Sequence, residues 1–255
     1  MLVRRRFTVP LQVLEPMDLD GRGAATLMLL NPTGGIVGGD VLETRVTVGA
    51  GADVCLTTPA ATRVYRSAGL PAVQRFTATV GEGARLAYVP DHLIPSPGAR
   101  LRQTTEIALE PHATLLLADA WAVGRVARGE RWQFDELDLA LAIRDERGQI
   151  LAERARLDRV ARDGLGLAEG FAYVATFAVV APDREDWEPV ANALTRALAG
   201  LGGTTRAGVS ALGRGGLVAR ALCASAPALD AAIAALWAAC RRALFDLDPL
   251  HLRKL

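Results

Sequence analysis

A glycine-rich segment that ends in a single carboxylate, residues 31–40 (NPTGGIVGGD), is the first candidate for binding a phosphate or a metal ion. A phosphate-binding loop needs a lysine and a helix after its glycines, so that backbone amides and the lysine hold the phosphates. Here no lysine follows, and the next residues, VLETRVTV, alternate as a β-strand does. The spacing does not match the dinucleotide fingerprint, and Asp40 alone cannot supply the oxygen ligands of a calcium loop. We therefore predict a backbone role, through positive φ or close approach between strands, for Gly34, Gly35, Gly38 and Gly39.

Side chains that usually build catalytic or metal sites are sparse in the rest of the chain. The sequence has 3 histidines and 3 cysteines, without a C-x-x-C pair, a Gly-x-Ser-x-Gly elbow or an H-E-x-x-H motif. Such a chain cannot easily build a closed, high-affinity site for a borderline metal. We expect Cys55, Cys223 and Cys240 to be free thiols in the core of a protein of the reducing cytosol.

Paired carboxylates leave one enzymatic alternative open. Glycoside hydrolases use two carboxyl groups, which Asp40, Asp119 and Glu130 could supply on a β-helix. Sugar-binding enzymes would normally expose aromatic platforms, however, and aromatic residues make up only 5% of this chain. A carbohydrate-active enzyme is therefore the second hypothesis.

Composition excludes several classes of partner. The chain of 255 residues is 51% hydrophobic, enough for a substantial core, and its 29 Lys and Arg nearly cancel its 28 Asp and Glu. Nothing in this balance indicates a nucleic acid or a membrane surface as partner. The N-terminus, MLVRRRFTVPLQV, lacks the apolar region of a secretion signal, and no window offers the roughly 20 apolar residues of a spanning helix. We expect a soluble, cytoplasmic protein.

The elements that must position these residues are indicated by a unit used three times. Val46–Pro59 (VTVGAGADVCLTTP), Ala78–Asp91 (ATVGEGARLAYVPD) and Ile107–Ala120 (IALEPHATLLLADA) share apolar positions around a short turn. The matching columns are Val48, Val80 and Leu109; Val54, Leu86 and Leu115; and Leu56, Tyr88 and Leu117. Recurrence at this spacing predicts strand–turn–strand layers, each burying a face against the next. An ordinary β-sandwich is the alternative.

The C-terminal part has a different pattern. Asp186–Leu201 and Ser225–Leu244 have helical apolar spacing, and residues 207–223 between them alternate like two strands. A fourth hairpin is expected around Asp145–Gly148. We predict one domain over residues 1–255, mainly β in an α+β arrangement. Residues 1–180 would form a layered, β-helix-like stack of antiparallel strand–turn–strand repeats, and residues 181–255 two helices with intervening strands.

Five segments in order resemble the urease accessory protein family UreD, also called UreH. Thr33 replaces one family glycine in the first segment and Arg63 the usual lysine in the second. The segments are NPTGGIVGGD, LTTPAATRVYRS (Leu56–Ser67), YVPDHLIPSPGAR (Tyr88–Arg100), GRVARGE (Gly124–Glu130) and ERARLD (Glu153–Asp158). The chain departs from the family at both ends: it starts close to its first strand-like segment and ends in DPLHLRKL, without a Pro-Arg-rich tail. Contacts that relatives make through their ends are therefore not carried over.

The resemblance implies a function that is not enzymatic. Members are maturation chaperones of the cytosol that bridge apo-urease to a helical accessory protein, UreF, and a GTP-hydrolysing one, UreG, so that nickel reaches the urease active site. It also implies a β-helix-like stack with a small helical element and no nucleotide bound by this chain itself. No cofactor would be held permanently, and nickel would only pass in transit. A purely structural assembly protein, without a role in metal transit, is a third hypothesis.

Candidate site residues follow from the family-like segments. A delivery protein needs few, hard and hydrated ligands for nickel, and Asp40, Thr57, Thr58 and Glu130 could line such a path. Hydrogen bonding within turns is an equally simple role for Asp40 and the threonines. Buried charges must be paired, so we predict that an arginine near Arg125 pairs with Glu130 or Asp119, the alternative being solvated charges at layer edges. The structural arginines of the motifs are Arg66, Arg100 and Arg125.

Overall fold

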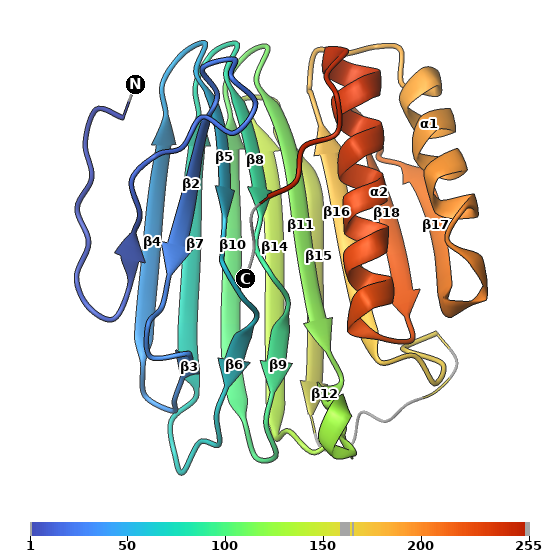
Figure 1. Cartoon of the computed structure of the whole chain (residues 1–255). Helices are drawn as coiled ribbons and strands as arrows, with labels where there is room; N and C mark the ends of the chain where they lie inside the picture. Colours follow the sequence, from blue (N-terminus) through green and yellow to red (C-terminus); the bar gives the residue numbers. More distant parts are fainter. Residues whose placement is uncertain (1, 159–163, 165, 253–255) are drawn as a thin grey trace.

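Two β-sheets lie face to face in a computed structural model that describes residues 2–158, 164 and 166–252 (Figure 1). We call the sheet that carries the helices the front sheet. Its strands, in spatial order, are β1 (Gln12–Val13), β2 (Ala25–Leu30), β5 (Asp53–Thr57), β8 (Arg85–Val89), β11 (Thr114–Ala122), β16 (Tyr173–Val180), β18 (Gly216–Cys223) and β17 (Thr205–Ala211). Three short strands extend it: β3 (Gly35–Ile36), β6 (Thr62–Val64) and β9 (Leu93–Pro95).

The back sheet has its strands in the order β15 (Gly148–Asp158), β14 (Glu136–Asp145), β10 (Arg100–Leu109), β7 (Ala72–Val80) and β4 (Val41–Val48). A separate ribbon pairs β12 (Gly124–Arg125) with β13 (Glu130–Arg131) at one end of the stack. Each repeat sends one strand to the back sheet and the next to the front sheet, so that the chain winds in layers (Figure 1).

The three repeats stack in the register that the sequence predicts. In the back sheet Val80 pairs with both Val48 and Leu109, and in the front sheet Leu86 pairs with both Val54 and Leu115. Tyr88 likewise pairs with Leu56 and Leu117. These apolar side chains form the core between the sheets. The layered, mainly β stack is therefore confirmed.

The direction of pairing within the stack differs from the prediction. The two strands of one repeat do run in opposite directions, but they lie in opposite sheets and share no ladder. Hydrogen bonds join equivalent strands of successive repeats, and these pairs are parallel: β4 with β7, β7 with β10, β5 with β8, and β8 with β11. The physical reason is that the short turns of the repeats arch from one sheet to the other, so that they do not close hairpins.

The C-terminal elements agree with the sequence pattern. Helices α1 (Glu188–Ala199) and α2 (Ala226–Phe245) flank the hairpin of β17 and β18, and β14 and β15 form the fourth hairpin. Ser225 caps α2 by accepting a hydrogen bond at its Oγ from the amide of Ala228. The apolar faces of both helices pack on the outer face of the front sheet, where Leu194 and Leu236 join a buried cluster with Phe177. None of the helices in the described ranges is long and apolar enough to span a bilayer.

Candidate functional site: a polar cavity between the sheets

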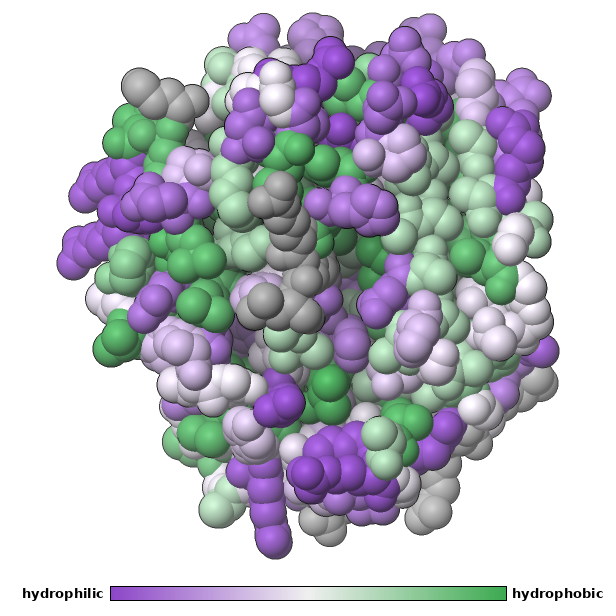
Figure 2. All heavy atoms as spheres, viewed as in Figure 1, coloured by the Kyte–Doolittle hydropathy of each residue, from purple (hydrophilic) through white to green (hydrophobic). Residues whose placement is uncertain are grey.

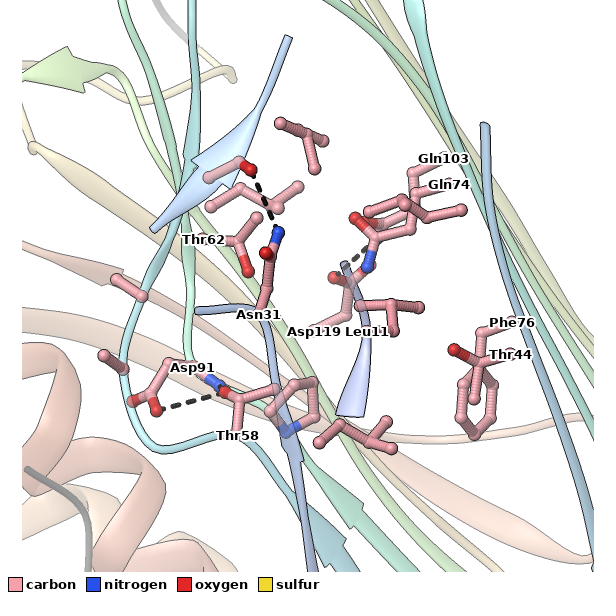
Figure 3. A pocket seen from close by; sticks show the side chains of 18 of the residues that line it. Leu11, Asn31, Thr44, Thr58, Thr62, Gln74, Phe76, Asp91, Gln103 and Asp119 are labelled. Atoms are coloured by element: carbon pink, nitrogen blue, oxygen red, sulfur yellow. Dashed lines mark hydrogen bonds between the residues drawn. The ribbon is translucent and has the colours of Figure 1, made fainter. Parts of the chain in front are cut away.

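A break in the front sheet opens a cavity of about 210 Å³ between the two sheets (Figure 3). Three neighbouring strands stop at the same level and resume a few residues later: β2 before β3, β5 before β6, and β8 before β9. The connecting residues lie around the cavity, whereas β11 runs on without interruption. Three family-like segments therefore meet at one place, which explains why polar residues gather in them.

The floor of the cavity is made by inward-facing positions of the back sheet. Gln74 pairs with Gln103 across β7 and β10, and the next inward pair is Phe76 with Thr105. Elsewhere in the stack these positions hold the apolar core residues. Side chains of a strand alternate between its two faces, so Gln74 and Gln103 point toward the opposite sheet as the core residues two positions away do. The cavity thus brings polar side chains among the apolar residues of the core.

Asp119 is the acidic group on the opposite wall. It comes from β11, and its Oδ1 accepts a hydrogen bond from Gln103 Nε2 at 3.3 Å (Figure 3). The pKa of Asp119 is raised to about 6, chiefly by burial; the hydrogen bond from Gln103 opposes this shift, and the nearby charge of Glu153 adds to it. Gln74 Oε1 is buried and has no hydrogen-bond partner in the described part of the chain. The cavity therefore presents a carboxylate and an unsatisfied amide oxygen.

The mouth of the cavity holds a second set of oxygen atoms. Thr58 Oγ1 donates to Asp91 Oδ2 at 3.2 Å and accepts from the Asp91 amide at 2.8 Å. Asn31 Nδ2 donates to the carbonyl of Gly35 at 2.9 Å (Figure 3). Carboxylates, hydroxyls and amide oxygens are hard donors, which suit hydrated divalent cations better than soft metals. In the described ranges, no three His, Cys, Asp or Glu side chains are placed to hold a metal ion together.

A family model described as the UreD urease accessory protein matches residues 1–254. The chain belongs to the UreD family. It is 32% identical to the urease accessory protein UreD of Arthrobacter sp. (strain FB24) over 252 residues, which cover 96% of this chain and 85% of the relative. It is 35% identical to the UreD protein of Deinococcus radiodurans over 257 residues, covering 99% and 89% of the two chains. Membership in this family assigns the chain a role in urease maturation.

The glycines of this UreD chain serve its backbone geometry. Gly34 and Gly39 have φ values of +74° and +90°, which side-chain-bearing residues rarely adopt. Gly35 and Gly38 lie against neighbouring backbone, because an added Cβ would be 2.5 Å from the carbonyl oxygen of Arg63 and 2.7 Å from that of Leu70. The segment thus folds tightly beside the cavity, and Gly34 and Gly35 are among its lining residues.

Only one of the four residues expected on a nickel path lines the cavity, and it is Thr58. Thr57 is fully buried and donates from its Oγ1 to the carbonyl of Val89 at 2.6 Å. Asp40 closes the turn of the glycine segment, accepting from the amide of Val37 at 2.9 Å. Glu130 lies in the β12–β13 ribbon. The carboxylates named for a glycosidase do not meet in the cavity either, since only Asp119 of Asp40, Asp119 and Glu130 lines it.

The charged residues of the family-like segments are largely paired. Arg125 binds Glu130 through both Nε and Nη2, which is one of the pairings that the sequence predicts. Arg100 Nη2 donates to Glu136 at 2.9 Å. Arg66 lies at a bridge with Ala99, and its side chain packs on Gly98. The arginines therefore join strands and loops, and Asp119 binds a glutamine in place of an arginine.

Sequence reasoning missed Gln74, Gln103 and Asp119 as members of one site. A signal was present in the repeats, because Thr58, Pro90 and Asp119 occupy equivalent positions, two residues after Leu56, Tyr88 and Leu117. All three of these equivalent residues line the cavity. In two of the three repeats, this position holds a polar residue where the apolar column ends, and it marks the layer where the stack opens.

Proposed function

We propose that this chain is a non-catalytic scaffold that bridges apo-urease to UreF and UreG while nickel is inserted into the urease active site. Membership in the family supports the role in urease maturation. The observation that carries the finer proposal is the cavity between the sheets, lined by the carboxylates of Asp119 and Asp91 and by uncharged oxygen donors. We place the protein in the cytoplasm, with nickel as cargo and with no permanent cofactor or nucleotide of its own.

The donor set of the cavity suits passage of nickel better than storage. Asp119 lies inside the cavity and Asp91 at its mouth, each beside amide or hydroxyl oxygens. A divalent cation that meets one carboxylate at a time stays mostly hydrated, so the cation can leave again. The raised pKa of Asp119 adds proton competition, because the carboxyl must be ionised to attract a cation. Thr58 and Asp91 would meet the ion at the mouth, and Gln74 and Gln103 deeper inside. Asp40, Thr57 and Glu130 do not line the cavity, so any part that they have in the nickel path would lie outside it.

The helices are the surface that we propose for UreF. Their apolar sides pack on the front sheet, but Ala199, Ala231 and Ala234 are exposed. Figure 2 shows a largely pale green, weakly hydrophobic surface over α1 and α2, with purple hydrophilic residues above it at the top of the molecule. Small side chains allow another helix to approach closely, as a helical partner requires.

The experiment that tests the function is reconstitution of urease from its parts. Apo-urease, UreF, UreG, GTP and nickel are combined with and without this chain, and urease activity and complex composition are measured. The proposal predicts an assembled complex and active urease only when the chain is present. Equal activation without the chain, or failure of the chain to bind UreF and apo-urease, would contradict it. A complex that assembles but activates equally well when the cavity is altered would support a purely structural role.

A further inference from the structure

The large hydrophobic side chains that are exposed to solvent gather in one region of the molecule. Among the described residues there are seven of them, and all seven come before β7: Val3, Phe7, Val9, Leu14, Val37, Val41 and Leu70. From β7 onward, the described part of the chain leaves no large hydrophobic side chain exposed. A single exposed hydrophobic residue is ordinary, but confinement of all of them to one region indicates a surface that another molecule covers.

These residues lie at the side of the stack that is farthest from the helices. β1 ends the front sheet and β4 the back sheet on that side, whereas β17 ends the front sheet on the other side, beside α1. Figure 1 shows the N-terminal segment at the same side as β1 and β4, and Figure 2 shows green hydrophobic residues there among purple hydrophilic ones. We call the surface formed by residues 2–14, 37–41 and 70 the N-terminal edge.

Two neighbouring loops form one part of the N-terminal edge. The loop before β4 and the loop before β7 are joined by their backbones, since the amide of Gly39 donates to the carbonyl of Pro71 at 3.3 Å. Val37, Val41 and Leu70 belong to these adjacent segments, and they are 47%, 58% and 75% exposed. The loops are thus held together by backbone contact, and their large apolar side chains are not used in the core.

The N-terminal segment adds cations to this edge. Arg5 fastens the segment to the front sheet, because its Nη1 donates to the carbonyl of Val13 at 3.1 Å and its guanidinium forms an ion pair with Glu15. Arg4 and Arg6 are exposed, and within the described residues neither of them forms an ion pair. The edge therefore combines exposed apolar side chains with two unpaired cations. A complementary surface would carry apolar residues with carboxylates beside them.

We propose that apo-urease docks at the N-terminal edge, through an apolar patch bordered by carboxylates. This inference rests on the proposed function, in which the chain holds apo-urease and UreF at the same time. Two proteins can bind together only at separate surfaces, and the helices proposed for UreF lie at the other side of the front sheet. The N-terminal edge stays open when the helices are covered. The cavity lies between the two surfaces, since Asp119 is on β11 and the front sheet runs from β1 through β11 to β17.

The test measures binding of apo-urease and of UreF to the purified full chain, in separate experiments. Val9→Asp together with Leu70→Asp places two carboxylates on the apolar part of the edge, and should weaken apo-urease binding about tenfold or more while UreF binding stays unchanged. Both side chains are exposed, so the fold should persist, which thermal melting checks. The matched control is Ala152→Asp, at an exposed apolar position of β15, the strand at the other end of the back sheet. It should leave both partners bound as before.

The cations are tested by a second variant, which also serves if the first one does not fold. Arg4→Glu together with Arg6→Glu should weaken apo-urease binding several-fold at low salt and less at high salt, because salt screens exposed charges. The matched control is Arg144→Glu together with Arg156→Glu, which makes the same change of net charge at two exposed arginines of β14 and β15. The control should bind apo-urease as the natural chain does.

The outcomes separate failure of this inference from failure of the proposed function. A natural chain that binds no apo-urease contradicts the proposed function and the inference with it. If the natural chain binds apo-urease and the edge variants bind it equally well, only the docking surface is overturned. The same holds if the variants lose UreF in place of apo-urease, or lose only self-association or binding to vesicles of anionic phospholipid.

Discussion

Gln103 on the back sheet donates a hydrogen bond across the cavity to Asp119 on the front sheet, with 3.3 Å between Nε2 and Oδ1. The contact joins the two sheets at the layer where the front sheet is interrupted. This hydrogen bond only partly compensates the loss of solvent around a partly buried carboxylate, since the pKa of Asp119 still lies at about 6. A protein that keeps such a group accepts a cost in stability, which indicates use of the charge.

The first prediction is that Asp119→Asn stabilises the fold at neutral pH. The pKa of Asp119 is raised from 3.8 to about 6, so above pH 6 the folded state contains an ionised, poorly solvated group. As the pH falls from about 6 toward 4, the folded state takes up a proton that the unfolded chain does not, and the cost disappears. Urea unfolding should show the variant more stable by about 2 kcal/mol near pH 7.5, with the difference shrinking toward zero near pH 4. A constant difference at all pH values would contradict the raised pKa.

The second prediction concerns acid stability at the opposite end of the back sheet. Asp145 has a buried side chain and accepts two bonds of 2.6 Å from Arg214 and one of 3.2 Å from Arg147. Its pKa is lowered to about 2, chiefly by Arg214. The stabilisation is therefore present above the ordinary value of 3.8 and is lost as the pH falls through 2. Asp145→Asn should cost about 2 kcal/mol at pH 7 and flatten the acid part of the stability curve.

The control for Asp145 is an exposed ion pair. Arg242 and Asp246 lie at 3.2 Å with side chains that are 59% and 92% exposed. Asp246→Asn should change the free energy of unfolding by less than about 0.5 kcal/mol. Equal effects of the two substitutions would mean that the burial of Asp145 does not matter.

The third prediction concerns the glycine segment. Gly35→Ala should cost about 2–4 kcal/mol, because the new methyl group would meet the Arg63 carbonyl at 2.5 Å and the Tyr65 ring at 2.6 Å. Gly39→Ala should cost more than about 1 kcal/mol through its positive φ alone. Gly69→Ala is the matched control, since nothing lies within 4 Å of its added Cβ. Melting temperatures decide the ranking, and three equal values would remove the steric argument.

The stacking of the repeats was predictable from the sequence, whereas the partner of each strand was not. The apolar columns fix which layers meet, because Val48, Val80 and Leu109 must share one face. A turn such as Gly-Ala-Gly-Ala can either close a hairpin or arch between two sheets, and its residues do not distinguish the two. The prediction that the strands of the repeats pair antiparallel was therefore wrong. The site was hidden for a related reason. Gln103 and Asp119 face each other only because their strands lie in opposite sheets, and neither belongs to a short motif.

The fourth prediction tests the surface proposed for UreF. Ala231→Glu together with Ala234→Glu places two charges on the exposed side of α2 and should reduce co-purification of UreF about tenfold or more. Thr79→Glu adds a charge to the exposed face of the back sheet and should have no effect. Unchanged binding by the α2 variant, with its fold intact, would remove this helix from the interface.

The most direct test of the account is nickel transfer through an assembled complex that carries Asp119→Asn. The substitution keeps the shape of the cavity and, by the first prediction, does not weaken the fold, so a loss of activation cannot arise from unfolding. The control is Glu106→Gln, which removes an exposed carboxylate from the outer face of the back sheet. We predict that the Asn variant assembles with its partners but activates urease several-fold less, and that the natural chain loses activation as the pH falls through about 6. Full activation by the Asn variant in a complete complex would contradict the account.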